Sequence, residues 1–126
     1  MATTQALNLL VVDDEPDMVS GLKRILKAQG FTVEIANSGS EAIDCARLHQ
    51  PDGILMDLKM PGMNGVEAVR EIRAMFPNVF IIFMTGYSEL VREAEEEGPV
   101  AVLSKPIDPG QVCELIENAS REGDCV

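Results

Sequence analysis

The sequence predicts an α/β domain with a doubly wound, five-stranded parallel sheet and five helices. Short apolar runs that are too short for core helices recur along the chain, and several of them end in polar or charged residues. Between these runs lie longer segments whose apolar residues return at helical spacing. Because strands and helices alternate, the connections are crossovers, the strands run parallel and the helices cover both faces of the sheet.

The first half of the chain supplies three strands, predicted at residues 7–13, 31–36 and 53–57. Pro16 marks the first turn of the first helix, with Asp14 or Glu15 as its cap, and Gly30 ends that helix. A Ser-x-x-Glu capping pattern that begins at Ser38 starts the second helix. A loop dense in Pro, Gly and Asn separates the third strand from the third helix.

The second half supplies strands at residues 79–84 and 100–104 and a last helix capped by Asp108. The helix predicted at residues 87–97 is weak, because the three glutamates at 95–97 crowd its C-terminal end, where the helix dipole disfavours anions. We therefore expect it to be the loosest helix of the domain.

Length and composition narrow the class of protein. The chain has 126 residues, with 10 Lys and Arg against 21 Asp and Glu and a formal net charge of −11. This length suits a single domain that folds without disulfides or metals, with a core over about residues 7–119 and a frayed polar tail at 120–126. The acidic balance argues against direct binding of nucleic acid and against docking on anionic membranes.

Targeting and redox features favour the cytoplasm. The first residues lack the basic segment and the long apolar run of a secretory signal. The longest apolar run, at residues 79–84, is far shorter than the roughly 18–20 residues that a membrane helix needs. Three widely spaced cysteines suit a reducing compartment, and no Cys/His cluster indicates zinc.

Polar residues of related chemistry follow the predicted strands. Asp13 and Asp14 end the first strand, Asp57 the third, Thr85 the fourth and Lys105 the fifth. In such sheets the functional crevice lies at the carboxyl ends of the strands. Three carboxylates that meet there repel one another, so they need a cation to offset their charge. Lys105 supplies one positive charge, and a hard divalent ion such as Mg²⁺ supplies the rest.

This set of groups suits phosphoryl transfer. A carboxylate can act as the nucleophile and form an aspartyl-phosphate. A metal ion, an ammonium group and a hydroxyl can stabilise charge on the transferred oxygens during in-line displacement. Each residue alone is typical of a helix cap, a turn or an exposed lysine, so the prediction depends on their convergence at one edge of the sheet.

Four segments occur in order between Leu10 and Ile107: LVVDDEP, DLKMPGMNG, FMTGY and LSKPI. Through them the sequence resembles the receiver domain of two-component response regulators, the family that includes the chemotaxis regulators. The segment that begins at Asp57 is highly specific, whereas Asp-Asp or Lys-Pro alone is a weak signal. The resemblance implies a flavodoxin-like strand order of 2-1-3-4-5 and one receiver domain over residues 1–126.

The resemblance also implies a metal site. Asp13, Asp14, Asp57 and the backbone carbonyl of Lys59 match the residues that hold Mg²⁺, with Mn²⁺ as an alternative ion. Asp14 matches the direct ligand of the acidic pair, and Asp13 acts largely through water.

Three further positions match the phosphoryl chemistry of the family. Asp57 matches the phospho-acceptor, Thr85 the switch hydroxyl and Lys105 the ammonium that pairs with the phosphoryl group. The Lys105–Pro106 peptide bond is expected to be cis, as in this family. The implied protein is not an enzyme in the usual sense, because it catalyses only its own phosphorylation and dephosphorylation.

The implied partners are a histidine kinase or a histidine phosphotransfer protein, followed by a downstream effector domain or protein. Phosphorylation would reorder the weak helix at 87–97 and switch the surface that it forms with the strand at 100–104 and the last helix. The same surface is a candidate for homodimer formation.

Two departures from the family pattern affect this interpretation. Val102 stands where the family usually has Tyr or Phe, so the aromatic half of the usual two-residue switch is missing. The apolar approach at residues 98–101 indicates either a more buried edge strand or a docking surface. In addition, Lys59 and Tyr87 lie two residues beyond Asp57 and Thr85, at positions that flank the attack path in this family, and we hypothesise that they limit or orient the water that hydrolyses the aspartyl-phosphate.

Other classes of protein remain open. A phosphorylation-independent interaction module with the same fold is disfavoured by the complete set of site residues but kept open by Val102. An aspartyl-phosphate phosphatase needs a second acid two residues after its nucleophile, where Lys59 stands. A flavin-binding relative needs a phosphate loop after the first strand, where the acids at 14–17 repel phosphate instead.

Overall fold

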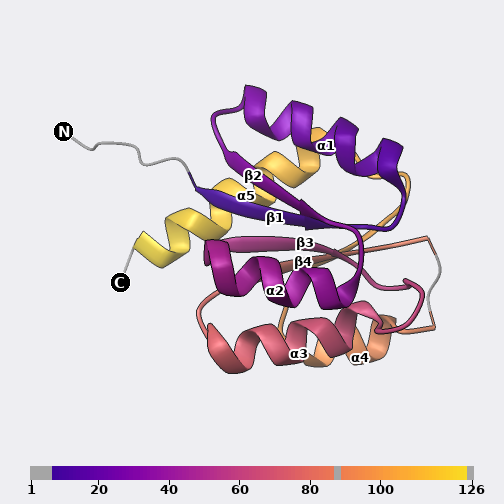
Figure 1. The fold of residues 1–126 in the computed structure, drawn as a ribbon. Helices are drawn as coiled ribbons and strands as arrows, with labels where there is room; N and C mark the ends of the chain where they lie inside the picture. Colours follow the sequence, from indigo (N-terminus) through magenta and orange to yellow (C-terminus); the bar gives the residue numbers. More distant parts are fainter. Residues whose placement is uncertain (1–6, 87–88, 125–126) are drawn as a thin grey trace.

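The computed structural model describes residues 7–86 and 89–124, and within them five parallel strands form one sheet in the order β2-β1-β3-β4-β5 (Figure 1). The strands are β1 (Asn8–Val12), β2 (Thr32–Ala36), β3 (Gly53–Asp57), β4 (Phe80–Thr85) and β5 (Ala101–Ser104). The helices are α1 (Pro16–Ala28), α2 (Gly39–His49), α3 (Gly65–Met75), α4 (Val91–Glu96) and α5 (Pro109–Asp124). The predicted fold class and strand order are confirmed.

The sheet separates two layers of core. Helices α1 and α5 cover one face, and α2, α3 and α4 cover the other (Figure 1). Alternate residues of β1 show the division, since Leu9 and Val11 pack with the α1/α5 side, and Leu10 and Val12 with the other. Every residue of the central strand β3 is buried, which holds Asp57 at its end on a rigid base.

Local signals position the helices that flank the strand ends. Asn64 and Glu67 form a reciprocal capping box at the start of α3. The Ser38 hydroxyl accepts from the Glu41 amide as predicted for α2, although the Glu41 carboxylate accepts from the Asn37 amide. At α1 the expected side-chain cap is absent: Glu15 occupies the cap position but its own amide donates to Asp13 instead.

The bounds of four strands, β1, β2, β4 and β5, differ from the sequence prediction by one residue, and two helices differ by more. α4 begins at Val91, later than the expected residue 87, and it ends at Glu96; residues 87–88 lie outside the described part of the chain. α5 continues to Asp124, so the last helix extends five residues beyond the core boundary predicted at residue 119. Polarity does not end a helix, and Arg and Glu are good helix formers. No helix in the described ranges is long and apolar enough to cross a bilayer.

Candidate functional site

The parallel sheet brings the predicted site residues to its carboxyl edge. Asp13 directly follows β1, Asp57 ends β3, Thr85 ends β4 and Lys105 directly follows β5. Backbone hydrogen bonds continue into this edge, since the Lys105 amide donates to the Thr85 carbonyl at 2.8 Å and the Asp13 amide donates to Ala36 at 3.2 Å. Burial of Asp13, Asp57 and Thr85 shows that these side chains face into the protein.

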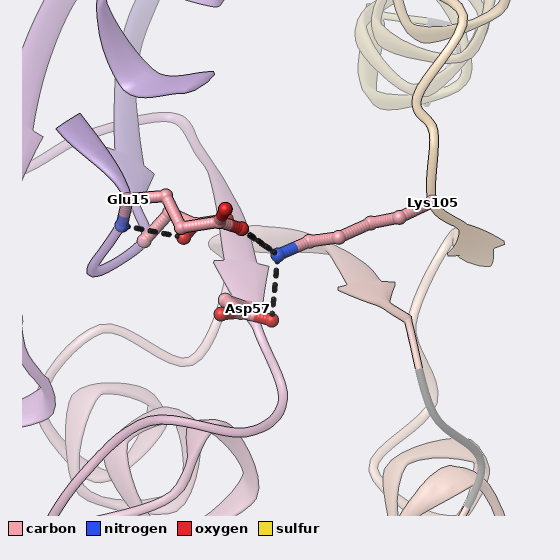
Figure 2. A network of polar contacts seen from close by, with 4 residues as sticks. Glu15, Asp57 and Lys105 are labelled. Atoms are coloured by element: carbon pink, nitrogen blue, oxygen red, sulfur yellow. Dashed lines mark hydrogen bonds and ion pairs between the residues drawn. The ribbon is translucent and has the colours of Figure 1, made fainter. Parts of the chain in front are cut away.

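The Lys105 ammonium lies at the centre of the polar network. Its Nζ is 3.3 Å from Glu15 Oε1 and 3.4 Å from Asp57 Oδ1 (Figure 2). It also lies 2.9 Å from Asp13 Oδ2. The following Lys105–Pro106 peptide bond is cis, as predicted. The lysine therefore reaches across the edge from β5 and meets acids delivered by β1, β3 and the start of α1.

Glu15 was not among the predicted site residues. The sequence offered one signal, a third acid directly after Asp13 and Asp14, and capping explained it sufficiently. The contact with Lys105 joins residues 90 positions apart, so it depends on the tertiary fold.

The acidic pocket fits a hard divalent ion. Carboxylate oxygens of Asp13, Asp14 and Asp57 all lie within 4.8 Å of one another. Asp13 is fully buried, and its Oδ2 lies 2.9 Å from the Lys105 ammonium, which compensates part of the negative charge of the cluster. Asp14 is exposed and faces the pocket mouth, which Lys59 and Gly86 also line. All-oxygen donors with an open side suit Mg²⁺, which keeps several waters.

The electrostatics of the pocket perturb the acid and the base within it. Burial, followed by the charge of Asp13, raises the pKa of Asp57 to about 6, although Lys105 acts in the opposite direction. For Lys105, burial opposes the charged form, but the polar contact with Asp13 and the charge of Asp57 outweigh burial and raise its pKa. One ammonium thus offsets only part of the negative charge, which leaves a site prepared for a further cation.

A pocket of about 390 Å³ opens beside Thr85, between β5 and α4. Its lining includes Val91, Glu95 and Val102. Val102, the position that departs from the family pattern, therefore lines this pocket.

Lys59 and Tyr87, the two predicted flanking residues, differ in what the structure describes. The Lys59 side chain is exposed at the pocket mouth and its Nζ lies 3.6 Å from Glu89 Oε1. Tyr87 lies outside the described residues.

Comparison with known proteins places this geometry in a family. The family model described as the response regulator receiver domain matches residues 9–117. Sporulation initiation phosphotransferase F of Bacillus subtilis (strain 168) is 30% identical over 111 residues, which cover 86% of this chain and 90% of that protein. Chemotaxis protein CheY of Thermotoga maritima is 35% identical over 116 residues, which cover 90% of this chain and 97% of that protein.

Longer relatives and solved structures agree with this placement. Transcriptional regulatory protein ZraR of Escherichia coli (strain K12) is 34% identical over 93% of this chain, which spans only 27% of ZraR. The CheY-like receiver domain protein from Methanospirillum hungatei JF-1 superposes with a TM-score of 0.88 at 27% identity, covering 97% of this chain and 100% of that one. The chain therefore belongs to the response regulator receiver domain family of two-component signalling.

Proposed function

We propose that this receiver domain is a phosphorylation switch that accepts a phosphoryl group on Asp57 in a magnesium-dependent reaction. The observation that supports this most directly is the convergence of three carboxylates, one ammonium and one hydroxyl at a single sheet edge. The donor class is a phosphorylated histidine on a kinase or a phosphotransfer protein. Cytoplasmic location and a single receiver unit over residues 1–126 belong to the same proposal.

Asp57 acts as the nucleophile. One of its carboxylate oxygens forms the new bond to phosphorus as the bond from phosphorus to the donor nitrogen breaks, and the leaving imidazole keeps the electron pair. With a pKa of about 6, the carboxylate is mostly ionised above neutral pH, so it needs no general base. Burial at the end of β3 fixes its orientation for in-line attack.

Lys105 and Thr85 stabilise the transferred group. The Lys105 ammonium already lies 3.4 Å from Asp57 Oδ1 and can pair with a phosphoryl oxygen after transfer. The Thr85 hydroxyl can donate to another of those oxygens when its side chain turns toward the pocket. When bound by Asp13, Asp14, Asp57 and the Lys59 carbonyl, Mg²⁺ would offset the carboxylate charge and that of the phosphoryl oxygens.

The readout of the switch is the surface of α4, β5 and α5, offered to an effector or to a second copy of the chain. Turnover is limited to the phosphorylation and slow hydrolysis of the domain itself. Lys59 at the pocket mouth is placed to influence that hydrolysis, and Lys59→Ala is expected to change the decay rate of the adduct. An unchanged decay rate would remove Lys59 from the proposal.

The test is incubation with Mg²⁺ and a small phosphodonor, followed by mass spectrometry of the intact protein. Wild type should gain one phosphoryl mass, which Asp57→Asn and the omission of Mg²⁺ both abolish. Asp44→Asn, which alters an exposed acid on α2, is the matched control and should behave as wild type. No adduct in wild type, or an adduct that persists in Asp57→Asn, contradicts the proposal and favours a phosphorylation-independent interaction module.

A further inference from the structure

Glu15 is the third carboxylate on the Lys105 ammonium, and its situation differs from that of the other two. Asp13 and Asp57 are buried, with 0% and 5% of their side chains exposed, whereas 66% of the Glu15 side chain is exposed. The Glu15 amide donates to Asp13 Oδ1 at 2.9 Å, which fixes the backbone beside the pocket. Its side chain then extends from the start of α1 toward the Lys105 ammonium (Figure 2).

This position places a negative charge where a phosphoryl donor must arrive. Glu15 lines the pocket mouth together with Asp14, Asp57 and Lys105. An incoming phosphoryl group is itself anionic and needs Lys105 as its counter-charge. Glu15 therefore opposes the reaction in two ways, by repelling the donor and by sharing the ammonium that the product requires.

We infer that Glu15 is a positioning residue that slows phosphorylation of Asp57 by holding Lys105 in the unphosphorylated arrangement and repelling anionic donors. This inference rests on the proposed function. Because the side chain is exposed, it can swing into solvent once the phosphoryl group takes the ammonium. Glu15 thus slows the transfer of a phosphoryl group to Asp57 without preventing it.

The experiment compares Glu15→Gln with wild type in the rate of adduct formation on Asp57, with Mg²⁺ present. Acetyl phosphate serves as the more anionic donor and phosphoramidate as the less anionic one. The variant should react about three- to tenfold faster with acetyl phosphate, with a smaller gain for phosphoramidate. The gain should shrink as salt is raised, because Glu15 is exposed and its charge is screened.

Two matched variants separate charge from structure. Asp17→Asn removes another exposed acid, from the first turn of α1, and should change the rate by less than about twofold, since no ion pair with Lys105 is described for it. Glu15→Asp keeps the charge and should stay near wild type.

Each result decides the question. If wild type forms the adduct but Glu15→Gln reacts no faster than Asp17→Asn, or its gain is insensitive to salt and donor charge, the inference is wrong and the proposed function stands. If wild type forms no adduct on Asp57, both fail.

Discussion

Helices α3 and α4 follow the neighbouring strands β3 and β4, which deliver Asp57 and Thr85, yet they are built differently. α3 has eleven residues, a complete capping box and an arginine in its last turn, all of which agree with helix physics. α4 has six residues, no side-chain cap, no base in its last turn, and Ala94 as its buried residue. The acceptor side of the pocket is therefore rigid, and the hydroxyl side is weakly supported.

Two arginines of α3 bind the C-terminal end of α4. Arg70 Nε of α3 donates to the Glu97 carboxylate at 2.8 Å, and Arg73 donates to the Glu97 backbone carbonyl. Arg73 also reaches the Val79 carbonyl at 3.2 Å. These arginines compensate the acidic C-terminal end of α4, which its own sequence leaves uncompensated. The end of α4 nearest Thr85 has no comparable side-chain cap.

The largest expected effect on stability comes from Gly65→Ala, which disrupts the contact between the start of α3 and the end of β3. A Cβ at position 65 would lie 2.3 Å from the Asp57 carbonyl oxygen and 3.0 Å from Leu58 Cα, so the backbone must shift. We expect a loss of about 3 kcal/mol in the free energy of unfolding, measured by urea denaturation. Gly21→Ala is the control, because its Cβ would meet nothing within 4 Å, and it should stabilise α1 by about 0.5–1 kcal/mol.

The second prediction removes the anchor of α4. Arg73→Met should destabilise the domain by about 2 kcal/mol, since it deletes charged hydrogen bonds to two carbonyls in a half-buried position. Hydrogen exchange should accelerate more in α4 than in α3. Arg92→Met, on the exposed face of α4, should have little effect on either measurement. Equal acceleration in both helices would mean that Arg73 does not act as an anchor of α4.

The third prediction concerns Asp57 at the end of β3. Its carboxylate is buried, so ionising it lowers the free energy of unfolding. The pKa of Asp57 is raised to about 6 in the folded protein, so ionisation there is unfavourable relative to the unfolded chain. The penalty is absent below about pH 4, grows as pH rises and is complete above about pH 6. Without Mg²⁺, Asp57→Asn should exceed wild type in stability at neutral pH but not near pH 4.

The size of that difference follows from the shift. The rise of the Asp57 pKa from 3.8 to about 6 corresponds to at most roughly 3 kcal/mol, and screening at the open pocket reduces this to about 1–2 kcal/mol. Chemical denaturation of both proteins at several pH values with a chelator provides the measurement. A difference that does not change with pH would rule out this origin. Added Mg²⁺ should raise the melting temperature of wild type more than that of Asp57→Asn.

The smallest effect is expected for Arg70→Gln. The Arg70–Glu97 ion pair lies at the surface, where such pairs contribute little to global stability. The melting temperature should barely change, while amide exchange in α4 should accelerate by about twofold. A global loss as large as that of Arg73→Met would show that the two arginines act as one unit.

Much of the fold and site was predictable because it depends on local chemistry. Apolar runs marked the strands, and the acids that follow two of them marked the carboxyl edge of the sheet. Asp13, Asp57 and Lys105 meet there as expected. Parallel topology alone brings such residues together, whatever the length of chain between them.

The features that the sequence did not predict depend on tertiary contacts. The three glutamates at 95–97 indicated a loose helix, but not that Glu97, directly after α4, is bound by Arg70 and Arg73 of α3. The Glu15 contact with Lys105 had the same origin, since a residue at a helix start is explained equally well by capping. An ion pair between residues far apart in the sequence leaves no local sequence pattern from which it could be predicted.

The direction of the strands also determines where a label or a tether can be attached to the protein. β1 begins at Asn8 on the sheet edge opposite the acidic pocket, and α5 runs back to end at Asp124 on that same side (Figure 1). A fluorophore, an affinity handle or a surface tether joined beyond either point is carried away from Asp57. Phosphorylation could thus be followed on an immobilised or labelled chain without crowding the reacting edge.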